Sequence, residues 1–110
     1  MNIQIFGTRK CQDTRKAERY FKERRIPFQF IDLTQKGLSK GELNSVKNAV
    51  GLENLIDCSG KEYQRRNLKY LVHDVEEELL ADALLFKTPI VRNGPRATVG
   101  YMPEVWQTWE

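Results

Sequence analysis

The sequence predicts one α/β domain in which helices pack on a mixed β-sheet. An alternating apolar segment, an amphipathic helical segment and a second apolar segment open the chain, and this order is typical of a β-α-β unit. Two short apolar segments near the C-terminus, joined by a turn, predict a hairpin. The whole sequence contains no linker or internal repeat, and 110 residues that are 40% apolar suffice for one hydrophobic core. We therefore expect a single domain over residues 1–110.

The first strand and the first helix enclose a short basic loop. Ile3 and Ile5 alternate with polar residues, which predicts a strand of about five residues that ends near Phe6, before Gly7. The segment over residues 12–25 is predicted as a helix, because three apolar residues recur at the spacing of one helical face: Ala17, Tyr20 and Phe21.

A second strand and a capped helix follow. Pro27 ends the first helix, and the apolar side chains of residues 28–33 predict a strand. Ser39 and Glu42 have the spacing of a capping box, in which each side chain accepts a hydrogen bond from the backbone amide of the other residue. A helix is therefore expected to begin there, and Gly51 is expected to end it.

The middle of the chain predicts further helical pieces. Residues 52–72 combine a loop with short helical segments, which are indicated by Tyr63, Leu68 and Leu71. Asp74 and Glu77 repeat the N-cap pattern. The apolar residues that follow at helical spacing predict a helix that extends to Leu84.

The last third of the chain predicts a hairpin and a terminal helix. A strand entered through Pro89 and a returning strand over residues 97–99 are joined by an Asn93-Gly94 turn. Pro103 starts the last helix, for which two aromatic residues at helical spacing are expected to be hydrophobic anchors, Trp106 and Trp109. The complete order is that of a thioredoxin or glutaredoxin fold with a mixed sheet and a helical insertion.

Basic residues gather near the start of the chain. Residues 9–25 hold eight Lys and Arg against three acidic residues, whereas the rest of the chain holds ten basic and twelve acidic residues. We expect a basic face on the helix over residues 12–25, and such a face attracts anions. No nucleic-acid-binding motif accompanies these residues, so direct contact with nucleic acid is not expected.

The composition favours a cytoplasmic protein without a metal or membrane segment. No apolar stretch reaches the roughly 18 residues of a membrane span, and the N-terminus lacks the pattern of a secretory signal. Two cysteines are too few for a disulfide scaffold and suit redox chemistry in a reducing compartment. The chain has one histidine, His73, and no paired Cys/His spacing, so no metal site is expected.

Six local motifs follow one another along nearly the whole chain. They are Ile5-Phe6-Gly7 leading to Cys11, Thr14-Arg15-Lys16-Ala17, Phe28-Gln29-Phe30-Ile31-Asp32-Leu33, Leu38-Ser39 with Glu42-Leu43, Lys87-Thr88-Pro89-Ile90-Val91, and Val99-Gly100-Tyr101. Together they resemble the ArsC/Spx family of arsenate-reductase-like and Spx-like proteins, which has a glutaredoxin-related fold. The resemblance implies a cis peptide bond before Pro89 and places Pro89 opposite Cys11.

Cys11 is the candidate nucleophile. It precedes the first predicted helix, where the backbone amides of residues 12–14 and the Thr14 hydroxyl can stabilise a thiolate. Lys10 and Arg15 would add positive charge beside the sulfur. A thiolate attacks a disulfide sulfur to give a mixed disulfide, which a second thiol must resolve. The alternative is an inert Cys11 in a fold that has lost its redox activity.

The sequence allows two roles for Cys58 and offers several candidate substrate-binding residues. Cys58 is the only other cysteine, and it is either the resolving thiol or a loop or core residue without a redox role, in which case external glutathione resolves the intermediate. Lys10, Thr88 and Pro89 are candidate substrate-binding residues. Arg92, on the strand after Pro89, faces either the site or solvent.

The chain departs from the family pattern at positions that decide activity. Spx-like members have Cys-x-x-Cys, but Thr14 replaces the second cysteine. Glutaredoxin-linked arsenate reductases have a histidine four residues before the nucleophile and an arginine before the proline, where this chain has Gly7 and Thr88. The arginine expected after Leu55-Ile56 is also absent. Because a multiply charged oxyanion needs converging guanidinium groups, arsenate reduction is not expected.

The resemblance therefore implies a thiol oxidoreductase with a single nucleophilic cysteine, linked to glutathione or glutaredoxin. No bound cofactor is expected, with glutathione as co-substrate and glutathione or a redox protein as partner. The alternative is an Spx-like transcriptional regulator that docks on RNA polymerase through its basic surface and catalyses no reaction.

Overall fold

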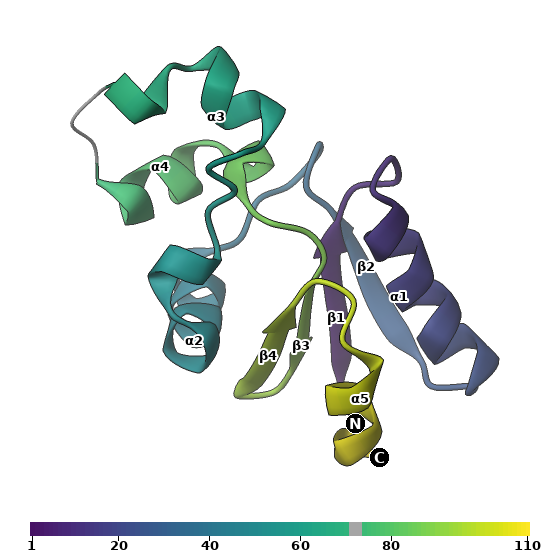
Figure 1. Cartoon of the computed structure of the whole chain (residues 1–110). Coiled ribbons are helices and arrows are strands. Elements are labelled where there is room, and N and C mark those ends of the chain that lie inside the picture. The colour runs from purple at the N-terminus through teal and green to yellow at the C-terminus, as the bar shows by residue number, and fades with distance from the viewer. Residues whose placement is uncertain (71–73) are drawn as a thin grey trace.

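The computed structural model describes residues 1–70 and 74–110. A four-stranded sheet forms its centre, with helices on both faces (Figure 1). The strand order is β2-β1-β3-β4, where β1 is parallel to β2 and antiparallel to β3, and β4 is antiparallel to β3. The predicted mixed sheet is confirmed. Its strands are β1 (Ile3–Gly7), β2 (Phe28–Asp32), β3 (Ile90–Asn93) and β4 (Arg96–Val99).

Two hydrophobic cores lie on opposite faces of the sheet. Neighbouring residues of a strand point to opposite faces, so Ile5 belongs to one core and Phe6 to the other. The Ile5 core includes residues of α1 (Gln12–Glu23) and Trp106 of α5 (Pro103–Trp106). The Phe6 core includes residues of α2 (Lys40–Val50) and of the helical insertion, which contains α3 (Lys61–Arg65) and α4 (Val75–Ala81). Four short 3₁₀ segments complete the described elements: η1 (Leu52–Asn54), η2 (Leu68–Tyr70), η3 (Ala83–Leu85) and η4 (Gln107–Trp109).

The predicted helix caps are present. The Ser39 hydroxyl accepts a hydrogen bond from the Glu42 amide at 3.1 Å, and the Glu42 carboxylate accepts one from the Ser39 amide at 2.8 Å. Gly51 ends α2 with a φ of 88°, a backbone conformation that glycine adopts without strain. The Asp74 carboxylate accepts from the amide of Glu77 and starts α4.

The predicted anchor role of Trp106 is also confirmed. Its ring is fully buried, and its indole Nε1 donates to the buried Thr98 hydroxyl at 2.8 Å. Trp109 is partly buried and packs against the same core. The terminal helix is therefore fixed to the sheet by aromatic packing and one buried hydrogen bond.

Three elements are shorter than predicted. Helix α1 ends at Glu23, because Arg25 has a φ of 58° and turns the chain toward β2. Strand β2 ends at Asp32 rather than residue 33. Helix α4 ends at Ala81 and not at Leu84, since the Asp82 carboxylate accepts a hydrogen bond from the Leu84 amide and opens η3.

The hairpin turn lies one residue later in the chain than predicted. Asn93 pairs with Arg96 within the ladder, so the turn is Gly94-Pro95 and not the predicted Asn93-Gly94. Pro95 is compatible with this turn because it lies outside both strands. Leu71 and His73, which entered the sequence predictions, fall outside the described residues.

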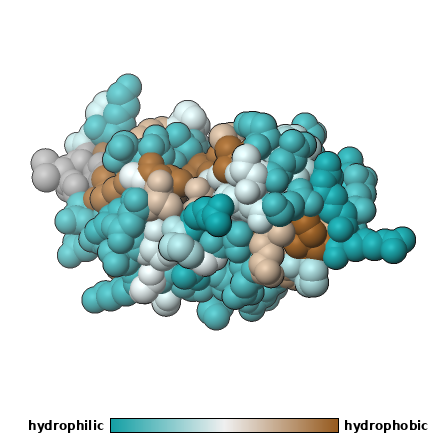
Figure 2. Space-filling view, turned by 90° about the horizontal axis from the view of Figure 1, so that it is seen from below, coloured by the Kyte–Doolittle hydropathy of each residue, from teal (hydrophilic) through white to brown (hydrophobic). Residues whose placement is uncertain are grey.

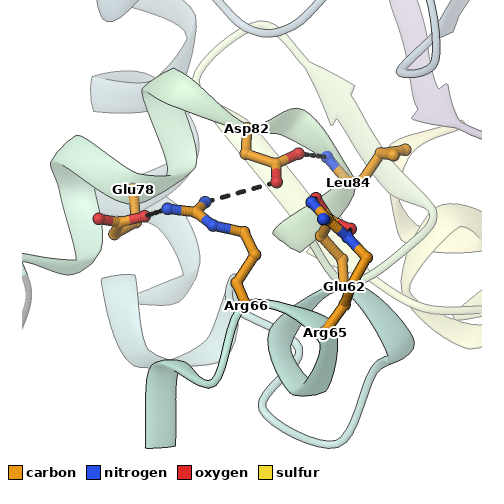
Figure 3. Close-up of polar contacts among 6 residues, drawn as sticks. All are labelled: Glu62, Arg65, Arg66, Glu78, Asp82 and Leu84. Carbon is orange, nitrogen blue, oxygen red and sulfur yellow. Dashed lines mark hydrogen bonds and ion pairs between the residues drawn. The ribbon is translucent and has the colours of Figure 1, made fainter. Parts of the chain in front are cut away.

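A charged network joins the parts of the insertion (Figure 3). Arg66 forms ion pairs with Glu78 of α4 and, at 3.4 Å, with Asp82. Arg65 binds both carboxylate oxygens of Glu62, at 2.8 and 2.9 Å. Hydrogen bonding to Arg65 lowers the pKa of Glu62 to about 2, while burial followed by hydrogen bonding to Glu62 raises the pKa of Asp82. These contacts hold α3 against α4 and η3.

Viewed from below, opposite the end of the sheet at which β1 finishes, the surface is mostly hydrophilic with small apolar areas (Figure 2). Over the part of the chain that the structure describes, none of the helices combines the length and apolar character that crossing a bilayer requires.

Candidate functional site

Cys11 is the N-cap residue of α1. Its backbone is extended, with φ −78° and ψ 120°, and its carbonyl accepts the first helical hydrogen bond from the Arg15 amide at 3.2 Å. The Cys11 amide donates to the Thr8 carbonyl at 3.1 Å, so a tight turn links the end of β1 to the helix. The half-buried thiol therefore lies at the positive end of the helix dipole.

The peptide bond between Thr88 and Pro89 is cis, as the resemblance implied. It precedes β3, whose residues pair with β1, so the Thr88 carbonyl is brought to the sulfur of Cys11. The thiol donates to that carbonyl at 3.8 Å. This contact and the register of the sheet establish that Cys11 and the Thr88-Pro89 segment face each other.

Hydrogen bonding at the sulfur favours the thiolate. Burial is the largest single contribution to the pKa of Cys11 and raises it, but the Thr14 and Thr88 side chains and the amides of Thr14 and Asp13 together outweigh burial. The pKa of Cys11 is therefore lowered. In the thiol form the sulfur makes no helix-capping hydrogen bond, and its proton points to the Thr88 carbonyl. Loss of that proton turns the sulfur into an acceptor for the surrounding donors.

Thr14 is the most constrained of these donors. It is fully buried, and among the described residues its Oγ1 has no hydrogen-bond partner of good geometry. Since the same hydroxyl lowers the pKa of Cys11, we assign the Cys11 sulfur as its acceptor in the thiolate form. Gly7 makes room for Thr14, because a Cβ on Gly7 would lie 2.4 Å from Oγ1 and 2.6 Å from the Thr14 methyl group.

A cleft of about 600 Å³ opens beside the sulfur. Its lining combines apolar and polar groups and includes one carboxylate and one ammonium, from Asp57 and Lys87. The isolated bridge between Ile56 and Phe86 brings these two chain segments together. Besides Cys11, the lining comprises Val50, Asn54, Asp57, Lys87, Thr88, Val99 and Gly100.

The structure separates the other sequence-predicted residues from this cleft. Arg15 is exposed on α1 and lines a shallow hollow there, and Lys10 lines a second cleft next to the site. Arg92 does not face the sulfur: its Nη1 donates to Gln4 Oε1 at 2.7 Å and its Nε to Ser45 Oγ at 3.3 Å.

Cys58 is a free, exposed cysteine outside the Cys11 cleft. It lines a separate hollow that includes Tyr63 and Tyr70. The neighbouring residue Asp57 does line the Cys11 cleft, so the chain passes close to the site while the Cys58 side chain lies on its outer side.

Sequence reasoning missed Asn54, Asp57 and Lys87 as cleft residues. Asn54 and Asp57 belong to none of the six motifs, and Lys87 is only the first residue of one of them. They line the Cys11 cleft because the insertion returns to the sheet through the Ile56–Phe86 bridge. The available signal was the Leu55-Ile56 segment. The family resemblance implies an arginine of the site just after it, so the residues that follow in this chain were candidates for the cleft. Within residues 1–70 and 74–110, no group of three or more His, Cys, Asp and Glu side chains could hold a metal ion.

Comparisons with known proteins agree with this fold. The chain is 29% identical to the uncharacterized protein YusI of Bacillus subtilis (strain 168) over 97% of each chain. It is similar in structure to an arsenate reductase from Vibrio cholerae, with a TM-score of 0.81, 21% identity and coverage of 98% of this chain and 97% of the other. A related protein from Brucella melitensis, described as arsenate reductase (ArsC) related, gives a TM-score of 0.69 at 22% identity, with 99% and 94% coverage. The ArsC family model matches residues 6–109. The chain therefore belongs to the ArsC family.

Proposed function

We propose that this protein is a thiol oxidoreductase in which Cys11 is the single nucleophile. The observation that carries the proposal is the lowered pKa of a half-buried thiol at a helix N-terminus, opposite the Thr88-Pro89 segment. Thr14 and Thr88 act as donors to the sulfur, and the adjoining cleft receives the group attached to the attacked sulfur.

A disulfide suits this site better than an oxyanion. Oxyanion reduction needs several cationic groups around the nucleophile, but the Cys11 cleft contains one ammonium, from Lys87, and one carboxylate, from Asp57. A carboxylate beside the reacting sulfur repels arsenate. We therefore propose disulfide exchange with a low-molecular-weight or protein disulfide, with glutathione as the co-substrate.

The exchange proceeds in two balanced steps. The Cys11 thiolate attacks one sulfur of the substrate disulfide and forms a mixed disulfide, while the other sulfur leaves as a thiolate and takes up a proton. A thiolate, for which we propose glutathione, then attacks the substrate sulfur of the mixed disulfide, so that a new disulfide forms between these two sulfurs and Cys11 leaves as a thiolate. Cys58 takes no part in this scheme because its side chain lies outside the Cys11 cleft.

The test is the reactivity of each cysteine. We expect Cys11 to react with iodoacetamide well below the pH at which an ordinary thiol ionises, and we expect turnover of a glutathione mixed disulfide to survive Cys58→Ser but not Cys11→Ser. Reactivity of Cys11 that rises only near the ordinary thiol pKa would refute the proposed nucleophile. Equal loss of turnover in both variants would instead assign the resolving role to Cys58.

A second candidate function is docking on RNA polymerase as an Spx-like regulator. The observation that favours it is the exposed basic face of α1, where Arg15, Lys16 and Arg19 line one hollow and form no ion pair with any described residue. A pull-down with purified RNA polymerase tests it. Retention by wild type and Cys11→Ser alike, with loss in the Arg15→Glu/Arg19→Glu variant, would support docking independent of thiol chemistry.

A further inference from the structure

A second cleft lies on the other side of the Thr88-Pro89 segment. Its volume is about 560 Å³, within the range of sites that bind small molecules or short chain segments. Thr88 and Asp57 line both this cleft and the Cys11 cleft, so the two clefts adjoin each other. Lys10, which precedes Cys11, also lines the second cleft.

The apolar part of this cleft comes from the insertion. Leu84 of η3 is 47% exposed, although most large apolar side chains of the described residues are buried. Phe86 and Ala83 lie beside it. The Asp82 carboxylate fixes the Leu84 backbone through a 3.1 Å hydrogen bond, and Asp82 belongs to the network of Figure 3. The backbone that carries this exposed apolar side chain is thus fixed at the wall of the cleft.

The cleft is lined by three cationic side chains and three carboxylates, but these differ in whether they are already ion-paired. Glu62 is ion-paired with Arg65, which does not line the cleft. Asp32 and Asp57 accept hydrogen bonds from the neutral groups of Thr34 and Ser59 and keep their charge. Lys10 and Lys61 are exposed, and neither forms an ion pair with a residue in the described ranges. With Arg9 they make three cationic side chains against the two carboxylates that remain, so one positive charge is left in excess for a ligand.

From this arrangement we infer that the second cleft binds an extended peptide segment of a protein disulfide substrate, with an apolar side chain on Leu84 and a carboxylate at Lys10 and Lys61. The inference rests on the proposed function and adds the substrate class. A peptide cysteine attacked by Cys11 has its neighbouring residues on either side of the sulfur, and the two adjoining clefts provide room for both directions of the chain.

Peptides activated as 2-pyridyl disulfides test the inference. The Cys11 thiolate attacks the peptide sulfur, the peptide–Cys11 disulfide forms, and the other sulfur leaves as pyridine-2-thione, whose absorbance reports the rate. One peptide has Leu and Glu near its cysteine, and the control peptide has Ser and Gln at the same places. We expect the first to react about tenfold faster with wild-type protein, the size expected from burying one leucine.

The variants Leu84→Asp and Lys61→Glu should reduce this ratio of rates toward one. Matched controls on the same insertion are Tyr70→Asp and Lys69→Glu, which change an exposed apolar residue and a lysine that line the separate hollow of Cys58. These controls should keep the wild-type ratio. An unchanged ratio in Leu84→Asp and Lys61→Glu, with both proteins folded by circular dichroism, would overturn the inference.

A second measurement separates this inference from the proposed function. NMR titration of Cys11→Ser with the Leu- and Glu-containing peptide, its cysteine replaced by serine, should shift the backbone signals of Leu84 and Lys61. Shifts there with no reaction at wild-type Cys11 would support the cleft and refute the nucleophile. Reaction at Cys11 with no such shifts, and no preference between the peptides, would refute the cleft alone.

Discussion

Replacing Thr14 by valine tests whether the buried hydroxyl serves the thiolate. Valine keeps the branched shape and removes Oγ1, which lacks a partner of good geometry among the described residues but lowers the pKa of Cys11. A hydrogen bond to a charged group contributes about 1.5–3 kcal/mol, and we take about 1 kcal/mol here because sulfur is a weak acceptor and Cys11 is partly exposed to solvent. The pKa of Cys11 should therefore rise, and the thiolate fraction at slightly acidic pH should fall about fivefold.

The assay is the rate of alkylation of Cys11 by iodoacetamide as a function of pH, measured in a Cys58→Ser background so that one thiol reports. Thr14→Ser is the matched control, since it keeps the hydroxyl and loses only the methyl group. We expect Thr14→Ser to keep the pH profile of wild type and Thr14→Val to shift it upward. The free energy of unfolding should instead fall more in Thr14→Ser than in Thr14→Val. Losing a buried methyl group costs about 1 kcal/mol, whereas removing a buried unsatisfied hydroxyl costs little.

Identical pH profiles for Thr14→Val and wild type would refute the assignment of Thr14 as a thiolate donor. If chemical denaturation shows that Thr14→Val does not fold, the same comparison is made between Thr14→Ser and Thr14→Ala, which differ by the hydroxyl alone. The same upward shift in Thr14→Ser would show that packing, and not the hydrogen bond, sets the pKa of Cys11.

Three further predictions concern stability. Gly7→Ala places a Cβ within 2.4 Å of Thr14 and should cost about 1–3 kcal/mol in urea denaturation, but well under half of that in a Thr14→Ala background; equal costs would contradict the contact. The Arg65 guanidinium lowers the pKa of Glu62 to about 2, so the ionised Glu62 stabilises the fold above its unfolded pKa of about 4.3 and loses that effect as the pH falls; Glu62→Gln should lose less thermal stability than wild type between these pH values, and parallel losses would disprove it. Trp106→Phe removes an indole donor from a buried hydroxyl and should cost about 2 kcal/mol in the same denaturation assay, where a change near zero would be inconsistent with that bond.

Local sequence patterns predicted correctly those features that depend on residues close together in the chain. The capping box at Ser39, the glycine end at Gly51 and the buried anchor Trp106 are all present, because each depends on residues a few positions apart. Element ends were less accurate. The helix after Asp74 stops early because the Asp82 side chain competes for a backbone amide, which hydrophobic periodicity does not register.

The candidate site divides in the same way. The nucleophile and its helix N-terminus follow from the sequence around Cys11, because a turn and a helix start are local features. The same stretch supplies Thr14, whose hydroxyl lowers the pKa of Cys11 from within one helical turn. The charged residues that seemed useful, Arg15 and Arg92, point to α1's outer surface and to the Gln4 side chain, since strand register and helix rotation decide direction.

The sequence by itself determined the family, the order of elements and the position of the candidate thiol, since these depend on motifs and on contacts within a helical turn. Only the tertiary structure decided what surrounds that thiol. Asp57 and Lys87 reach the Cys11 cleft because a single bridge closes the insertion onto the sheet. Leu84 and Lys61 form a second cleft because a network of ion pairs holds the insertion in place. Contacts between residues far apart in the chain depend on packing and strand register, which no local pattern encodes.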